Sequence, residues 1–216
     1  LTNYFIRKKM SNVRDSIGEI HNYGIDVKNR EIYLHSAKDN GEDDPGVDYR
    51  MAINFVKNIR HLDSLSSGEI RINMQSIGGG WQAGMAIYDA IQACKSYVTI
   101  VAYGQAESMS GIILQAADNR LMSPHSHFMA HFGSTDCSGD YLSAQKWAEL
   151  DKQNLETMLD IFATKCQKTG KYFKERKHNV SKTKAHIKRK MKDGDWYLTA
   201  SEAVQFGFAD GIDDGK

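Results

Sequence analysis

A single serine stands between a strand-like block and a helix-like block, and this unit constrains the fold more than any other part of the chain. Residues 97–103 are rich in β-branched side chains, which favours a buried strand. Residues 111–117 carry apolar side chains at helical spacing, and the segment 104–111 joins the two blocks. Because successive strand and helix units form crossover connections within one sheet, this pattern predicts an α/β fold.

Ser108 lies in this connection, at the expected start of the helix. Backbone N–H groups at a helix start have no partner within the helix, so a serine there can act as a nucleophile whose oxyanion is stabilised. Serine is also a preferred helix-capping residue, and that role alone would explain Ser108. The segment is not the G-x-S-x-G turn of α/β-hydrolases, because Ala106 and Ser110 occupy the glycine positions.

The composition is that of a soluble globular protein with enough residues for a full core. Of the 216 residues, 41% are hydrophobic and 25% are charged. No run approaches the roughly 18 apolar residues that span a bilayer, and the first ten residues lack the features of a signal peptide. Cys94, Cys137 and Cys166 are odd in number and widely spaced, which indicates reduced thiols and a cytoplasmic location.

The charge is distributed unevenly along the chain. The net charge is +1, yet residues 165–192 hold twelve Lys and Arg residues and a single acid, Glu175. Such a segment can bind nucleic acid or an acidic partner, or it can be a solvated helix that pairs with acidic faces of neighbouring subunits. Because it has little aromatic interleaving and no recognisable motif, we do not expect nucleic-acid binding.

Strand and helix signals alternate along most of the chain. We expect an N-terminal arm over residues 1–24 and one domain over 25–216. Residues 199–202 fit a capping box that opens a last helix. The other expected elements are strands at 30–35, 69–74, 97–103, 128–130 and 196–198, and helices at 49–62, 83–94, 111–117 and 140–168.

Two further patterns bear on chemistry. Gly78-Gly79-Gly80 follows an expected strand but lacks the spacing of a phosphate-binding loop, so it is either a plain tight turn or a close approach of backbone N–H groups to a substrate. His125, His127 and His131 share one face of a strand. A zinc site would require all three to converge from one extended segment, so a general base is the favoured interpretation and no metal is expected.

Four blocks, in this order, resemble the ClpP peptidase family. The resemblance covers about residues 28–213, and the acidic loop and the Gly-Asp-Trp-Tyr block are similar to the phage-type branch. It implies an α/β, crotonase-like fold of repeated β-β-α units, with a protruding handle helix at about 140–168 and a basic insertion at about 171–192. The blocks are SIGGGWQAGMAIYD at 76–89, GQAESM at 104–109, FMAH at 128–131, and DWYLTASEA at 195–203 followed by Phe206, Gly207 and Asp210.

The resemblance also implies a serine endopeptidase site. In it Ser108 is the nucleophile, His131 the general base and Asp195 the orienting carboxylate, with Asp193 as the alternative third member. The remaining implied positions are the backbone N–H groups of Gly79 and Met109 as the oxyanion hole, and Gly78, Gly79 and Gly80 as the peptide-binding segment.

The assembly implied by the resemblance is a homo-oligomer that cleaves polypeptides inside a chamber. It is a seven-subunit ring that can stack in pairs, needs no cofactor, and has an AAA+ unfoldase as a candidate partner. The chain departs from the family at Glu107 and Ser110 beside the nucleophile, and at 132–134, where the usual proline is absent. Two alternatives therefore stay open: a catalytically silent ring or scaffold subunit, and a crotonase-type acyl-CoA hydratase or isomerase that uses Glu107.

Overall fold

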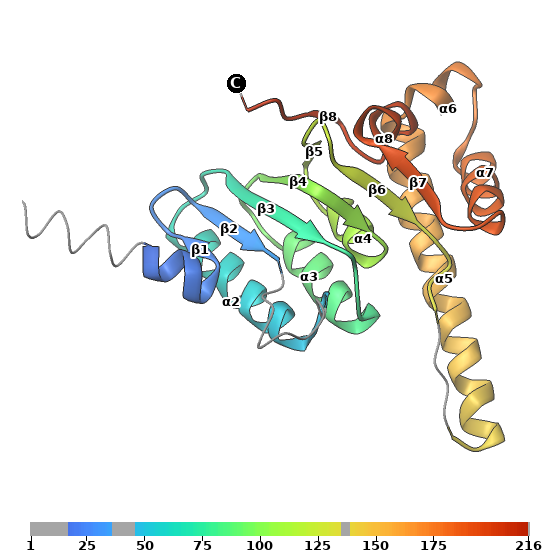
Figure 1. Cartoon of the computed structure of the whole chain (residues 1–216), viewed down its shortest axis with the longest axis horizontal. Coiled ribbons are helices and arrows are strands. Elements are labelled where there is room, and N and C mark those ends of the chain that lie inside the picture. The colour runs from blue at the N-terminus through green and yellow to red at the C-terminus, as the bar shows by residue number, and fades with distance from the viewer. Residues whose placement is uncertain (1–16, 36–45, 135–138, 216) are drawn as a thin grey trace, which may run out of the picture.

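One mixed sheet organises the chain (Figure 1). The computed structural model describes residues 17–35, 46–134 and 139–215, so residues 1–16 of the expected arm and most of the acidic loop lie outside the described residues. Residues 17–23 are helical. The strands are β1 Ile25–Asp26, β2 Glu31–Leu34, β3 Ile70–Ser76, β4 Val98–Glu107, β5 Asn119–Met122, β6 His127–Ala130, β7 Trp196–Thr199 and β8 Gly211–Ile212. The helices are α2 Tyr49–Leu65, α3 Trp81–Gln92, α4 Met109–Leu114, α5 Tyr141–Thr169, α6 Lys171–Glu175, α7 Val180–Lys192 and α8 Ala200–Phe206.

The sheet is mainly parallel, with the order β1-β2-β3-β4-β5-β8, and it has a branch in which β6 pairs with β4 and β7 with β6. Strands β2, β3, β4, β5 and β8 run parallel, whereas the β1–β2 and β6–β7 pairs are antiparallel. Figure 1 shows α2 and α3 against one face of the sheet, while α5 to α8 gather near β6 and β7. The α/β prediction is confirmed.

The branch arises because β4 changes its partner partway along its length. Its first half pairs with β5 over Thr99–Ala102, and its last three residues pair with β6. Between these halves β4 advances four residues while β3 advances two, and Gly104 adopts a φ of 64° there. A bulge of this kind bends a strand and redirects its end, and glycine takes the positive φ at little cost. The bulge therefore aims the end of β4 at β6.

Helix α2 illustrates how the sequence pattern becomes packing. Its apolar residues recur at a spacing of three or four, so they form one buried stripe. The helix begins after Asp48, whose carboxylate accepts a hydrogen bond from the Met51 N–H at 2.8 Å. Helix α8 begins with the expected capping box between Thr199 and Glu202, and this prediction is confirmed.

A buried arginine joins the last part of the chain to the sheet. The Arg120 side chain on β5 is 2% exposed and forms an ion pair with Asp210 at 2.5 Å. It also donates hydrogen bonds to Gln115 Oε1, to the Gly207 carbonyl and to Thr169 Oγ1. A buried guanidinium is tolerated only when its donors are satisfied in this way. The Gly207 and Asp210 positions of the sequence block therefore serve packing.

The basic segment is packed against α5 of the same chain. Lys184 on α7 forms ion pairs with Glu156 at 2.9 Å and Asp160 at 2.6 Å, and Lys188 pairs with Glu156 at 2.7 Å. His186, on the same helix, lies among aromatic rings that include Tyr172 and Phe206. Part of the positive charge is thus neutralised within the subunit, by acidic residues of α5.

Several element boundaries differ from the expectations. Strand β4 extends to Glu107, so the segment expected as a turn after residue 103 is largely strand. Helix α4 ends at Leu114, three residues earlier than expected. The short strands β1, β5 and β8 and the helix α6 lie outside the expected elements. Helix α7 falls in the basic segment, for which a solvated helix was one of the alternatives, and it has a buried side that includes Ile187 and Met191. Within the described ranges no helix is both long and apolar enough to cross a membrane.

Candidate active site

Ser108 occupies the single position between β4 and α4. Its backbone is held at φ 52° and ψ −121°, an uncommon conformation for a residue with a side chain. Its N–H donates to the Met129 carbonyl on β6 at 2.9 Å, which fixes the serine beside that strand. Backbone strain of this kind persists where surrounding structure imposes it, commonly at functional sites.

The register of three strands brings a histidine and an aspartate to this serine. Glu107 pairs with Met129 on β6, so Ser108 lies level with the end of that strand, where His131 follows. In the antiparallel β6–β7 pair, Ala130 is opposite Trp196. The next residues outward, His131 and Asp195, therefore face each other. The pairing of β4 with β6 and of β6 with β7 thus brings together Ser108 and Asp195, which are 87 positions apart in the sequence.

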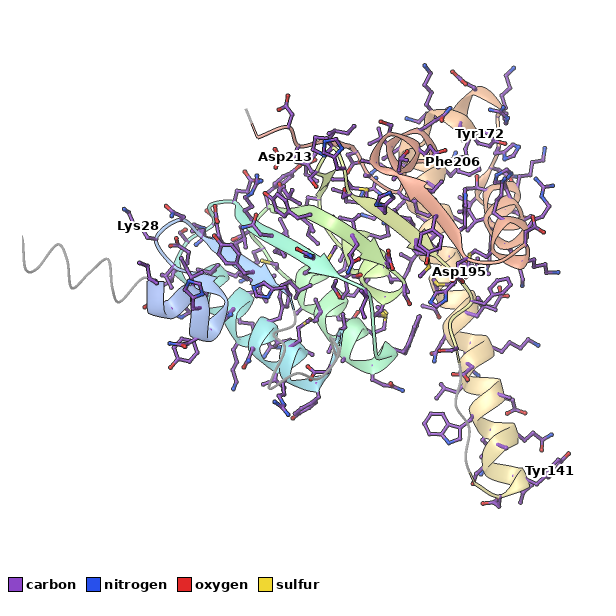
Figure 2. All side chains as sticks on the ribbon, viewed as in Figure 1. Lys28, Tyr141, Tyr172, Asp195, Phe206 and Asp213 are labelled. Carbon is purple, nitrogen blue, oxygen red and sulfur yellow. The ribbon has the colours of Figure 1, made fainter. Side chains whose placement is uncertain are left out.

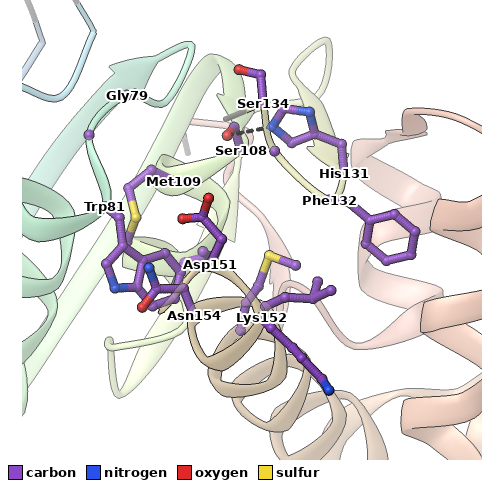
Figure 3. A pocket seen from close by; sticks show the side chains of 15 residues that line it. Gly79, Trp81, Ser108, Met109, His131, Phe132, Ser134, Asp151, Lys152 and Asn154 are labelled. Atoms are coloured by element: carbon purple, nitrogen blue, oxygen red, sulfur yellow. Dashed lines mark hydrogen bonds between the residues drawn. The ribbon is translucent and has the colours of Figure 1, made fainter. Parts of the chain in front are cut away.

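The distances within this group are short. His131 Nε2 lies 2.7 Å from Ser108 Oγ (Figure 3). On the other side of the ring, Nδ1 lies 3.5 Å from Asp195 Oδ1. Figure 2 shows Asp195 at the start of β7, and its side chain is 52% exposed. Asp193, the alternative third member, instead ends α7, where its N–H donates to the Lys190 carbonyl.

The glycine turn lies directly against the serine. Gly78 has a φ of 96°, and a Cβ built there would lie 2.6 Å from Ser108 Cβ. Val47 bridges this turn: the Val47 N–H donates to the Gly78 carbonyl at 2.6 Å, and the Gly80 N–H donates to the Val47 carbonyl at 2.8 Å. In such a parallel bridge the residue between the two bonded neighbours, here Gly79, directs its N–H and carbonyl away from the bridging residue. The Gly79 N–H accordingly has no acceptor among the described residues.

Met109 opens α4, where a backbone N–H has no acceptor within the helix. The two N–H groups that the resemblance singled out, those of Gly79 and Met109, therefore both lack an acceptor within the described part of the chain. Polar backbone groups near a pocket are normally satisfied by protein, water or ligand. This pair is suited to holding an anionic oxygen.

Glu107 precedes Ser108 and is half-buried, and its carboxyl interacts electrostatically with nearby histidines and with Asp195. Burial raises the pKa of its carboxyl, and the negative charge of Asp195 raises it further, while His127 and His131 lower it. The sequence left open whether Glu107 points to solvent or acts on the histidine. The structure places its charge within reach of both His131 and Asp195.

A cavity of about 590 Å³ adjoins Ser108 and His131 (Figure 3). Its lining comes from the glycine turn, the start of α3, α4, the segment after β6 and the middle of α5. Sequence reasoning missed most of these residues, because their positions on helices become relevant only when α5 packs beside the turn. The lining includes Trp81, Met109, Asp151, Lys152, Leu155 and Met158.

The three histidines do not converge. His125 lies in a turn before β6 and is exposed, His127 begins β6, and His131 follows it. Among the described residues no group of three or more His, Cys, Asp or Glu side chains could hold a metal ion. Only His131 contacts Ser108.

Comparison with known proteins assigns the family. Residues 44–216 match the Clp protease family. The ATP-dependent Clp protease proteolytic subunit 1 of Chlamydia abortus is 31% identical over 198 residues, which cover 90% of this chain and 95% of the relative. The ATP-dependent Clp protease proteolytic subunit of Deinococcus radiodurans is 28% identical over 171 residues, or 78% of this chain and 76% of the relative. That of Carsonella ruddii is 35% identical over 111 residues, covering 50% and 53%.

Proposed function

This chain belongs to the Clp protease family, and from that premise we propose that it is a serine endopeptidase subunit whose catalytic residues are Ser108, His131 and Asp195. The observation that carries the assignment of residues is the 2.7 Å contact between His131 Nε2 and Ser108 Oγ. A nucleophile and its base must lie within hydrogen-bond reach for the proton to be transferred.

The reaction proceeds in two halves. Ser108 Oγ attacks the carbonyl carbon of the scissile peptide bond while its proton passes to His131 Nε2, giving a tetrahedral intermediate. His131 then returns this proton to the leaving amine, the C–N bond breaks, and an acyl-enzyme remains. A water molecule then attacks the ester carbon while its proton passes to His131 Nε2. The bond between the acyl carbon and Ser108 Oγ breaks, His131 returns the proton to Ser108 Oγ, and the acid is released. Asp195 orients the ring through Nδ1 and stabilises the imidazolium that forms in each half.

Backbone groups stabilise the oxyanion and align the substrate. The unused N–H groups of Gly79 and Met109 donate to the oxyanion, each worth on the order of 3 kcal/mol in the transition state. Gly78 and Gly80 already pair with Val47 through one edge of the turn. An extended peptide therefore adds along the opposite edge, where Gly79 presents its N–H and carbonyl.

The subunit acts within a homo-oligomer, for which we propose a seven-subunit ring that encloses the active sites and can stack in pairs. The N-terminal half of α5 extends beyond the rest of the fold (Figure 1), and its exposed side chains include Tyr141, Leu142 and Trp147. Large apolar side chains grouped on a projecting helix are typical of a subunit interface. Because the relatives are named as ATP-dependent proteolytic subunits, we also propose an AAA+ unfoldase as the partner that delivers polypeptides.

Covalent labelling with a fluorophosphonate tests the catalytic assignment. We expect stoichiometric labelling of the wild type at Ser108, detected by mass spectrometry of the intact chain and its peptides. Ser108→Ala should remain unlabelled, and His131→Ala should be labelled far more slowly, because the serine loses its base. Ser64→Ala, on the exposed surface of α2, is the matched control and should be labelled like the wild type.

An unlabelled wild type, under conditions that label another serine peptidase, would contradict the mechanism. Intact oligomers that neither react nor hydrolyse peptides would point to the silent ring subunit. Native mass spectrometry gives the subunit number in the same preparation, and any number other than seven or fourteen would contradict the proposed ring.

A further inference from the structure

A carboxylate lies in the wall of the cavity beside the nucleophile. Asp151, on the middle of α5, lines the same cavity as Ser108 and His131. Its Oδ2 is buried and has no hydrogen-bond partner among the described residues. Figure 3 shows the carboxylate directed into the space between α5, Met109 and Trp81.

This arrangement leaves one carboxylate oxygen of Asp151 without a hydrogen-bond donor among the described residues. Burying a carboxylate oxygen without a donor is unfavourable, so such groups are normally paired. The nearest cation in sequence, Lys152, also lines the cavity, but Figure 3 shows its side chain extending away from the Asp151 carboxylate. Among the residues that line the cavity, none donates a hydrogen bond to this oxygen, which leaves it available to a donor from a bound substrate.

The rest of the cavity wall suits a long side chain with a charged end. Trp81, Met109, Leu155 and Met158 supply apolar surface around the carboxylate. Lysine and arginine side chains pack their aliphatic stems along such surface while the charged group finds a polar partner. The indole ring of Trp81 adds a face on which a cation is attracted. A short or acidic substrate side chain would not form a favourable interaction with the Asp151 carboxylate.

We propose that Asp151 determines specificity by selecting lysine or arginine as the scissile residue, the substrate residue whose carbonyl carbon Ser108 attacks. The inference rests on the proposed peptidase mechanism, because it places that residue's side chain in the cavity next to Ser108. Asp151 binds the cationic end of the side chain, and the apolar wall binds its stem. The sequence contains no pattern that marks Asp151 for this role.

Two fluorogenic peptides that differ only in the scissile residue test this proposal. One has lysine there and the other norleucine, whose chain is of similar length but uncharged. We expect the wild type to have a kcat/KM at least tenfold higher for the lysine peptide. Asp151→Asn should reduce this ratio by about tenfold, mainly through the lysine substrate, with norleucine cleavage changed by less than about threefold. Asp151→Ser provides a second variant of the same kind.

Glu149→Gln is the matched control, since it removes one negative charge from an exposed position on the same helix. It should keep the wild-type ratio, which separates a local contact from a general electrostatic effect. Equal ratios in the wild type, Asp151→Asn and Asp151→Ser would overturn the inference, and fluorophosphonate labelling of Ser108 in those samples would show that the peptidase mechanism still stands. A wild type that is neither labelled nor active overturns both.

Discussion

Replacing Gly78 by alanine tests whether the glycine turn holds the nucleophile in position. Gly78 has a φ of 96°, and an added Cβ would lie 2.6 Å from Ser108 Cβ, 2.7 Å from the Glu107 carbonyl oxygen and 2.9 Å from the Met109 nitrogen. Two of these three atoms belong to the backbone on either side of the serine, so no flexible side chain can move aside. The turn or the serine itself must shift.

The size of the shift follows from these distances. The contact with Ser108 Cβ is roughly 0.8 Å shorter than the 3.4 Å at which ordinary van der Waals contact begins. A displacement of about 1 Å in a catalytic group lowers the rate by about 10²-fold. The positive φ adds roughly 1–2 kcal/mol of backbone strain for any residue with a side chain. We therefore expect kcat/KM to fall by about two orders of magnitude.

Gly104→Ala separates the two effects. Gly104 also has a positive φ, 64°, but an added Cβ would lie 3.6 Å from its nearest neighbour, the Gln75 side chain. This variant shares the backbone strain without the collision, so it should lose about 1–2 kcal/mol of stability and retain activity within a few-fold. Peptide hydrolysis, fluorophosphonate labelling rates and urea unfolding measure these quantities. Wild-type activity in a folded Gly78→Ala, or equal losses in both variants, would refute the reasoning.

Two further substitutions test the triad and the packing of the basic segment. Asp195→Asn should lower kcat by about 10²-fold. This is less than the roughly 10⁴-fold effect at a buried triad aspartate, because the Asp195 side chain is 52% exposed. Asp193→Asn is the control, and equal kinetics in both variants would exclude Asp195 as the third member. His186→Phe should flatten the decline in stability as the pH falls from 6.5 to 4. Burial and the nearby Arg189 lower the pKa of His186 to about 4, so between these pH values the unfolded chain binds the extra proton and the folded chain does not. Urea unfolding across this range should show a change on the order of 2 kcal/mol in the wild type, and an equally steep decline in the variant would contradict this origin.

Sequence reasoning succeeded where local signals were strong. The helix at 49–62 carries a clear apolar stripe, the strand at 69–74 alternates, and the segment 199–202 has the residues of a capping box; each element exists in the structure. The prediction weakened where tertiary packing overrides local preference. Residues 104–107 include a glycine and polar side chains, yet they continue β4 because β6 supplies a second pairing partner.

Predicting the site depended on chemical identity for some residues and on geometry for others. Ser108, His131 and Asp195 were chosen from motif blocks, and the strand register then explains why their side chains lie together. Asp151 could not be predicted from the sequence, because a helix of 29 residues carries acidic residues on several faces. Only the packing of α5 shows which of them faces the cavity.

The sequence by itself determined which residues can carry the chemistry and which strongly patterned segments form strands or helices, since side-chain reactivity and hydrophobic periodicity are local properties. Tertiary structure decided the remainder: the bulge at Gly104 that turns β4 toward β6, the antiparallel register that sets His131 opposite Asp195, and the side of α5 that adjoins the cavity. These features depend on contacts between segments that are far apart in the chain. The free energy of such contacts cannot be read from a local sequence pattern.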